Sequence, residues 1–271
     1  MNIPNIIDTH AHLNMDFDND QAEAISRAAD AGVTNIITVG TDLESSRKAV
    51  ELSERYAGVY AAVGIHPHDV SAITMADMDT LGQIAMNPRV VAIGETGLDF
   101  YRDTSPKDKQ IMALLWQLDL AEETGLPVII HCRQATEEMV ALLCSRLSTP
   151  TSTRQQYRGV IHCFNGDINT AKEYLDMGFY ISLGGYIGYP KSKGLHEVIR
   201  SIPQDRLLVE TDCPFLPPQK YRGKRNEPSY LTFTVKALAE IMSAPYEDIA
   251  AATTQNAGRL FGLKIDIDAA T

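Results

Sequence analysis

Asn5-Ile6-Ile7-Asp8-Thr9-His10-Ala11-His12 stands near the start of this chain of 271 residues. The stretch begins with apolar residues, which are typical of a strand buried on both faces, and it ends in residues that can ligate a metal ion. The same order recurs along the chain: a short apolar run ends in histidine or a carboxylate, and a longer stretch with helical spacing follows. The pattern predicts a chain in which strands and helices alternate.

Eight runs of this kind predict strands, at Asn5–Asp8, Asn35–Val39, Tyr60–Ile65, Val90–Glu95, Val128–His131, Val160–Cys163, Tyr180–Leu183 and Leu207–Glu210. Helical stretches lie between them, at Asp20–Ala31, Leu43–Tyr56, Asp77–Met86, Pro106–Thr124, Thr136–Arg146, Asn169–Met177 and Gly194–Ile202. Two more helices are expected after the last strand, at Ser229–Met242 and Tyr246–Phe261. Gly32, Gly125 and Gly178 just beyond helix ends, and Asp167 as an N-cap, support these boundaries.

Eight strand–helix units without a linker predict an α/β fold, a closed (β/α)8 TIM barrel. An open doubly wound sheet is the alternative, but the Gly-x-Gly-x-x-Gly motif of its dinucleotide-binding form does not follow the first strand. We expect one TIM-barrel domain over residues 1–271, because such barrels commonly have about 250 residues. Residues 264–271 are expected to form a loosely held tail, and residues 148–158 a polar surface loop.

The composition excludes several classes of protein. Hydrophobic residues make up 44% and charged residues 22% of the chain, which is ordinary for a globular protein. There is no apolar run of about 18 residues and no signal peptide pattern, so no membrane association is expected. Four cysteines without a Cys-x-x-Cys pair favour a cytoplasmic protein. The net charge of −11 disfavours nucleic acid as a partner overall but leaves room for a local basic patch.

Residues that can ligate a metal gather at the carboxyl ends of the predicted strands. In a barrel these ends meet at one rim, where the catalytic residues of such folds lie. Six of the seven histidines stand there, and the seventh, His196, lies on a predicted helix. Six residues of the rim are candidate metal ligands: His10, His12, Glu95, His131, His162 and Asp212.

Six ligands are too many for one catalytic ion with an open coordination position, and they suit two ions that share a bridging carboxylate. His10 and His12 are two residues apart, which puts both side chains on one face of a strand. We assign His10, His12 and Asp212 to one ion and His131 and His162 to the other, with the glutamate of the fourth strand bridging both. Such ligands accept zinc, manganese, nickel or magnesium, and the sequence does not distinguish these metals.

For the other residues of the rim the sequence supports less specific expectations. His66 is expected to lie beside the ligands or to contact the substrate, and His68 to be an ordinary loop histidine. Cys132, Cys163 and Cys213 each directly follow a proposed ligand. Strand alternation predicts that these cysteines turn away from the barrel interior as buried, inert thiols.

Together these motifs resemble the TatD family of metal-dependent deoxyribonucleases, within the amidohydrolase-like superfamily. The resemblance runs from Asp8 to about Leu263. The motifs that carry it are DTHAH at 8–12, GIHPH at 64–68, GETGLD at 94–99, IHCR at 130–133, IHCF at 161–164, ETDCP at 210–214, YRGKRNEP at 221–228 and NAGRLF at 256–261.

The resemblance implies a (β/α)8 barrel, a divalent-metal hydrolase with the same six ligands, and cleavage of DNA phosphodiester bonds. We therefore expect a 3′–5′ exonuclease-like activity on single-stranded DNA that uses a metal-activated hydroxide, with Asp212 as general base and Glu95 as the bridging catalytic carboxylate. The alternative is a hydrolase of a small amide, lactone or phosphoester that uses the same two ions. A third hypothesis is a non-catalytic metal-binding barrel. No feature points to an obligate protein partner.

Positively charged residues follow the eighth strand and suggest phosphate recognition. Lys220, Arg222, Lys224 and Arg225 lie within six residues, and Tyr221 between them could stack on a base. Arg133 follows the fifth strand, and lysines at 191 and 193 follow the seventh. The candidate substrate contacts are therefore His66, Arg133, Tyr221, Arg222 and Arg225. The alternative for Arg222 is a structural ion pair with Glu227.

Overall fold

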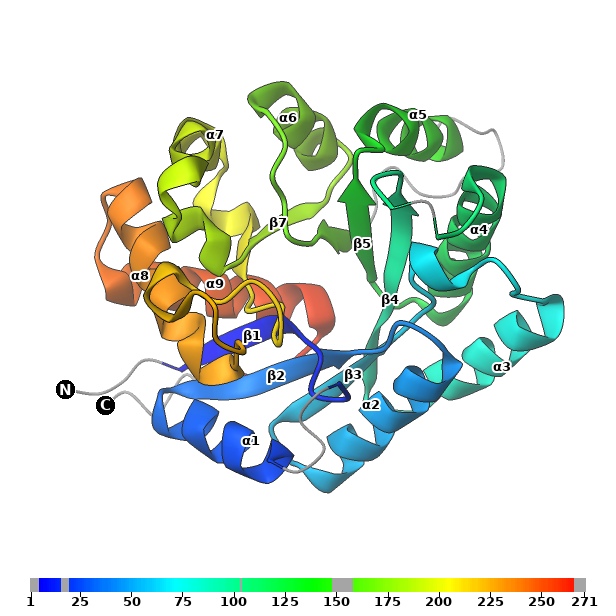
Figure 1. The fold of residues 1–271 in the computed structure, drawn as a ribbon, viewed down its shortest axis with the longest axis horizontal. Helices are drawn as coiled ribbons and strands as arrows, with labels where there is room; N and C mark the ends of the chain where they lie inside the picture. The colour runs from blue at the N-terminus through cyan, green and yellow to red at the C-terminus, as the bar shows by residue number, and fades with distance from the viewer. Residues whose placement is uncertain (1–4, 16–19, 103, 148–157, 266–271) are drawn as a thin grey trace.

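The protein is described by a computed structural model that covers residues 5–15, 20–102, 104–147 and 158–265. Eight parallel strands form one sheet in the order β1 to β8, so that neighbours in sequence are neighbours in space (Figure 1). The strands are β1 Ile6–Ala11, β2 Val33–Val39, β3 Val59–Val63, β4 Val90–Asp99, β5 Val128–Arg133, β6 Gly159–Ile161, β7 Tyr180–Leu183 and β8 Leu207–Val209.

The sheet curls round until β1 meets the segment that follows β8. Ala11 forms a parallel bridge with Cys213, and the Thr9 hydroxyl donates to the carbonyl of Val209 at 2.9 Å. Asp8 is fully buried, and its carboxylate accepts hydrogen bonds from the backbone N–H and the hydroxyl of Thr211 at 2.9 and 2.6 Å. The result is a nearly closed barrel, and the predicted (β/α)8 fold is confirmed.

Helices connect the strands and surround the barrel (Figure 1). They are α1 Gln21–Asp30, α2 Leu43–Arg55, α3 Met75–Ala85, α4 Lys107–Thr124, α5 Thr136–Leu147, α6 Ile168–Asp176, α7 Leu195–Ser201, α8 Leu231–Met242 and α9 Tyr246–Phe261. The predicted helix boundaries are confirmed at the residues that cap the helices. Gly32, Gly125 and Gly178 have positive φ angles, and the Asp167 side chain accepts the N–H of Thr170 at 2.8 Å. None of these helices has the length and apolar character needed to cross a membrane.

Three strands, β3, β6 and β8, end earlier than predicted, at the rim that carries the candidate ligands. β6 ends at Ile161 and β8 at Val209. Beyond them, Cys163 and Asp212 adopt left-handed backbone conformations, with φ angles of 49° and 55°. Residues other than glycine adopt this conformation rarely and at an energetic cost. His162 and Asp212 therefore lie on turns, where strand alternation no longer sets the direction of a side chain.

The amino-terminal end of the barrel is closed by α9. The Thr254 hydroxyl and the Asn256 amide donate to the carbonyls of Asn5 and Leu207, at the starts of β1 and β8. The last turn of α9 joins a core cluster with apolar residues from seven strands: Ile7, Ile37, Ala62, Ala92, Ile129, Val160 and Leu208. Ile265, in the predicted tail, packs on the same cluster. Residues 266–271 and most of the predicted surface loop, 148–157, lie outside the described residues.

We expect Asn256→Ala to destabilise the fold. The Asn256 side chain is fully buried and donates at 2.9 and 2.8 Å to the carbonyls of Gln204 and Leu207. Its loss would remove the side-chain donor from the buried carbonyl of Leu207, at a cost of about 1–3 kcal/mol. Urea unfolding should give a lower free energy of unfolding, and Asn256→Asp, which also lacks the donor, should behave similarly. An unchanged midpoint would show that α9 is not held by these bonds.

Candidate metal centre and active site

Glu95 lies at the centre of the polar rim. It comes from β4, its side chain is 5% exposed, and its two oxygens face different histidines. Oε1 is 2.8 Å from His131 Nδ1 and 2.9 Å from His162 Nε2. Oε2 is 3.4 Å from His10 Nε2 and 3.7 Å from His12 Nε2. The carboxylate therefore joins two groups of histidines, one on each oxygen.

The first group contains His10, His12 and Asp212. Asp212 Oδ1 lies 3.5 Å from His12 Nε2 and 3.9 Å from His10 Nε2. The Nδ1 atom of His12 lies 2.9 Å from the carbonyl of Val39, so this nitrogen carries the proton and Nε2 is left as a ligand atom. His10 is fully buried, and its Nδ1 has no hydrogen-bond partner among the described residues.

The second group contains His131 and His162. The Nε2 atom of His131 lies 3.2 Å from Oδ2 of Asp99, which is fully buried. Because a carboxylate only accepts, Nε2 donates to Asp99, and Nδ1, which faces the centre beside Glu95, becomes a ligand atom when a cation displaces its proton. Buried Glu210 similarly lies behind His162, with Oε1 3.5 Å from Nδ1. Oriented histidines of this kind are typical of metal sites.

The spacing of the donor atoms fits divalent cations. Two nitrogens at 2.0–2.1 Å from a tetrahedral ion lie about 3.3 Å apart. The Nε2 atoms of His10 and His12 are 3.2 Å apart, and so are His131 Nδ1 and His162 Nε2. Sets of such atoms converge within 4.8 Å around His10, His12 and Asp212, and around Glu95 with either His10 and His162 or His66 and His131. The residues present therefore fit a metal on each side of Glu95.

The electrostatics of the metal-free centre favour cation binding. Burial would raise the pKa of Glu95, but the surrounding histidines, His162 and His66 first among them, hold it well below its usual range. Burial lowers the pKa of His162, yet the carboxylates of Glu95 and, at 3.5 Å, Glu210 raise it well above its usual value. Burial also lowers the pKa of His10. A bound cation must displace protons from histidine, so its affinity rises with pH.

A cavity of about 650 Å³ opens above these groups. His66 lines it, with Nε2 3.5 Å from Oε1 of Glu95. Its Nδ1 accepts the backbone N–H of His68 at 3.1 Å, so the proton of the neutral ring is on Nε2. Burial lowers the pKa of His66 to about 4, which keeps the ring neutral. As a neutral ring, His66 is thus suited to donate a hydrogen bond from Nε2 into the cavity.

His68 is not an ordinary loop histidine, and that expectation was wrong. Its Nε2 lies 2.8 Å from the same Oδ2 atom of Asp99 that His131 contacts. The other oxygen of Asp99 accepts the backbone N–H groups of Tyr101 and Arg102 at 2.9 and 3.2 Å. Asp99 ends β4, and the sequence signal that could have revealed its role was a carboxylate just after the predicted fourth strand. Together these bonds fix the ring of His131.

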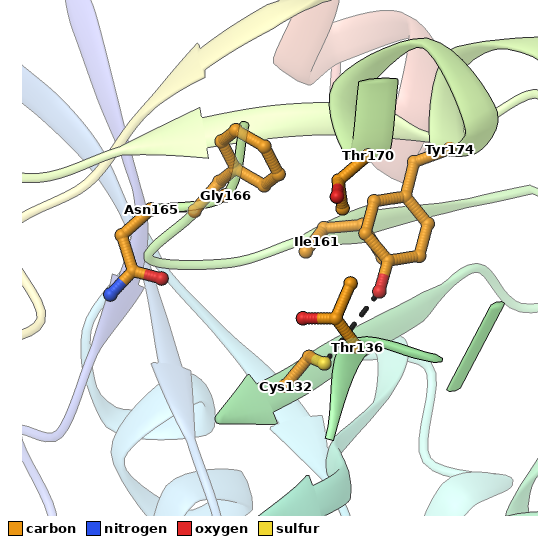
Figure 2. Close-up of a pocket in the computed structure, with 8 residues that line it drawn as sticks. Cys132, Thr136, Ile161, Asn165, Gly166, Thr170 and Tyr174 are labelled. Carbon is orange, nitrogen blue, oxygen red and sulfur yellow. Dashed lines mark hydrogen bonds between the residues drawn. The ribbon is translucent and has the colours of Figure 1, made fainter. Parts of the chain in front are cut away.

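The cysteines follow the prediction in part. Cys213 is fully buried, and Cys132 points toward α5 and α6, where its sulfur accepts the Tyr174 hydroxyl at 3.6 Å (Figure 2). Cys132 also borders the cavity, and Cys163 lines it because its left-handed backbone breaks the strand alternation. Burial raises the pKa of the Cys163 thiol well above its usual value, so it remains protonated and is a poor metal ligand.

The basic segment after β8 does not line the cavity. Arg225 pairs with Asp20, and Arg222 lies over the ring of Tyr189 at 4.8 Å. Tyr221 stacks on Tyr230 with ring centroids 3.9 Å apart, so one face of its ring is already covered. The alternative pairing of Arg222 with Glu227 was wrong, because both oxygens of Glu227 accept hydrogen bonds from Arg27. The proximity in sequence did not reveal these partners, which come from distant segments.

Arg133 does line the cavity, at the end of β5, and its guanidinium lies 3.9 Å from the centre of the Tyr101 ring. Arg102 also lines it, and the sequence reasoning gave this residue no role. Neither arginine has an ion pair with another described side chain. The cavity therefore combines a carboxylate and histidine floor with cationic side chains above it.

A barrel with a histidine–carboxylate centre at the carboxyl ends of its strands defines the class of metal-dependent barrel hydrolases. The TatD-related DNase family model matches residues 7–262, and the chain belongs to this family. It is 44% identical to an uncharacterised metal-dependent hydrolase, YabD of Bacillus subtilis, over 94% of this chain and 98% of that protein.

Two further relatives bear on the site. The chain is 35% identical to a protein of Klebsiella pneumoniae named 3′-5′ ssDNA/RNA exonuclease TatD, over 92% of this chain and 95% of the relative. The crystal structure of YjjV, a TatD homologue from Escherichia coli, superposes with a TM-score of 0.88 at 33% identity, and the match covers 97% of this chain and all of that one. The similarity therefore includes the whole barrel and every strand that carries a candidate ligand.

Asp99→Asn should weaken metal binding without unfolding the protein. Asparagine replaces one of the two accepting oxygens with an NH2 donor, so either the histidines or the backbone N–H groups lose their acceptor, and such changes typically lower metal affinity about 10- to 100-fold. Titration of the metal-stripped protein with zinc or manganese would measure the effect. Asp79→Asn, an exposed carboxylate on α3, is the matched control and should bind metal normally. Equal affinities in the two variants would contradict the orienting role of Asp99.

Proposed function

We propose that this protein is a metal-dependent exonuclease that removes nucleotides from the 3′ end of single-stranded DNA. The observation that carries the proposal is the position of Glu95, whose two oxygens face separate groups of ligands beneath a cavity lined by Arg102 and Arg133. A chain of phosphodiesters needs both features: a centre that activates water and cations that hold the phosphates. The exonuclease name of the Klebsiella pneumoniae relative supports the same substrate class.

Two divalent ions would be held by the candidate ligands. His10, His12 and Asp212 would bind one ion, His131 and His162 would bind the other, and Glu95 would bridge both. When bound, the ions supply a water of lowered pKa, from about 15.7 to about 7, and offset the charge that builds on the phosphate oxygens. The donor set accepts zinc, manganese, nickel or magnesium.

The chain's own residues would move the proton and hold the phosphate. Burial by itself raises the pKa of Asp212, but the hydrogen bond with His12 and the nearby histidines lower it, so the carboxylate is ionised and can accept the proton of the attacking water. His66 donates from Nε2 toward the phosphate as a neutral ring. Arg133 can donate two parallel N–H groups to phosphate oxygens.

The proposed setting is the cytoplasm. Cys132, Cys163 and Cys213 carry free thiols, which suits a reducing compartment. The substrate partner is single-stranded DNA, because a cavity at the end of a barrel more easily admits a single strand than a duplex. A small phosphoester would be the second candidate substrate, since the same centre and Arg133 would accept it.

Metal-stripped protein should shorten a 5′-labelled single-stranded oligonucleotide only after magnesium, manganese or zinc is restored. Asp212→Asn should lower the rate about 10²- to 10⁴-fold, as expected for loss of a general base, while His10, His12 and Glu95 keep part of the metal in place. Asp176→Asn, an exposed carboxylate that ends α6, is the control and should cleave at the wild-type rate.

Three results would contradict this proposal in different ways. Failure to shorten DNA with any metal, in protein that binds two ions, would favour a small-molecule hydrolase. A single bound ion would refute the bridged centre. Wild-type turnover by Asp212→Asn would exclude this residue as the base.

The cleavage rate on single-stranded DNA should fall as salt is raised. Each phosphate neutralised on a single strand contributes a slope of about −0.7 to a plot of log affinity against log salt, so contacts from Arg102 and Arg133 predict about −1.4 for kcat/KM. Arg133→Gln should reduce this slope by about half. Turnover of a neutral p-nitrophenyl ester should not vary with salt. A flat profile with DNA would show that these arginines do not hold phosphates.

A further inference from the structure

Phe215 is a large apolar side chain exposed at the mouth of the cavity. Half of its surface is accessible, and the neighbouring Leu216 is 37% exposed. Both residues line the cavity. The Phe215 ring meets the ring of His12 edge to face at 5.9 Å, so it lies directly beside a candidate metal ligand. Exposed apolar side chains that gather at the rim of a polar site mark a place where a ligand is bound.

The backbone holds Phe215 in this position. Its N–H donates to the carbonyl of Asp212 at 2.9 Å, and its own carbonyl accepts the side-chain amide of Asn226, which is 1% exposed, at 2.6 Å. Two residues further on, the carbonyl of Pro217 accepts the hydroxyl of Tyr189 at 2.6 Å. The exposure of the ring therefore does not come from a loose loop. The ring is presented by a fixed segment that also carries Asp212.

The opposite wall of the cavity is cationic. In a barrel with strand order β1 to β8, the ends of β4 and β5 lie across the rim from the segment after β8. Arg133 ends β5, and its guanidinium rests on Tyr101, which follows β4 and is 55% exposed. With one face on the ring, the N–H groups at the edge of the guanidinium remain available to an anion.

A flat apolar ring on one wall and a cation on the other, with the metal centre between them, match the two ends of a nucleotide. We infer that Phe215, with Leu216 beside it, is the platform on which the terminal nucleobase stacks while the phosphate lies between the metal centre and Arg133. This inference rests on the proposed function and names the contact that positions its substrate. It also moves the stacking role from Tyr221, whose ring is covered by Tyr230, to Phe215.

The platform has a consequence for specificity. Every nucleobase has an apolar face, so stacking on Phe215 would hold any base and would not select a sequence. A substrate without a base should lose this contact. The loss of base–aromatic stacking corresponds to about 5- to 100-fold in affinity.

Calorimetric titration of the metal-loaded protein can isolate the contact without turnover. Wild-type protein should bind deoxyadenosine 5′-monophosphate about 5- to 100-fold more tightly than 2-deoxyribose 5-phosphate, which lacks only the base. Phe215→Ala should remove this difference, Phe215→Leu should remove most of it, and Phe215→Trp should restore it. The metal content of each variant is measured in parallel, because Phe215 touches His12.

Cleavage then separates this inference from the proposed function. Wild-type protein should remove an ordinary 3′ nucleotide faster than a 3′ abasic residue, and Phe215→Ala should lose that preference. If DNA is not cleaved but the two ligands still differ in affinity, the platform stands and the nuclease proposal fails. If DNA is cleaved while wild-type protein binds both ligands equally and ignores the abasic end, the platform is wrong and the nuclease proposal stands.

Discussion

The structure depends on the burial of one carboxylate among histidines. Glu95 is almost inaccessible to solvent, and a buried charge of this kind is costly unless it is paired. The compensation comes from imidazoles on both of its oxygens. These imidazoles come from β1 and the residue just after it, from β5 and from the turn after β6, so closure of the barrel is what brings them to β4. Closure of the barrel and pairing of the Glu95 carboxylate therefore depend on each other.

Behind the candidate ligands lies a layer of groups that set the orientation of the rings. Asp99 holds His131, and the carbonyl of Val39 holds His12. Asp8 contributes in another way, because its carboxylate ties β1 to Thr211, next to Asp212. Burial raises the pKa of Asp8 to about 7, which shows how completely this link is removed from water. A ring held in this manner cannot rotate its ligand atom away from the centre.

Much of the fold and of the centre could be predicted from the sequence, because both follow from local periodicity. Eight apolar runs followed by helical stretches predicted the barrel, and His10 and His12 were expected to lie together from their spacing alone. The structure brings all six predicted ligands to one centre. The predicted direction of a side chain was wrong where the backbone departs from strand geometry. Strand alternation misplaced Cys163, since the backbone after β6 turns left-handed and directs this side chain to the cavity.

The sequence by itself determined the order of the strands, the rim on which the polar residues lie, and the residue types that can bind a cation. These features can be predicted because each depends on residues only a few positions apart in the sequence. Only the tertiary structure decided which charged side chains face the cavity. In the sequence Arg222, Arg225 and Arg133 are equally good candidates for phosphate binding. In the structure Arg222 lies on Tyr189 and Arg225 pairs with Asp20, whereas Arg133 lies on Tyr101 at the cavity wall. Such partners come from distant segments and are set by chain packing, which no local pattern encodes.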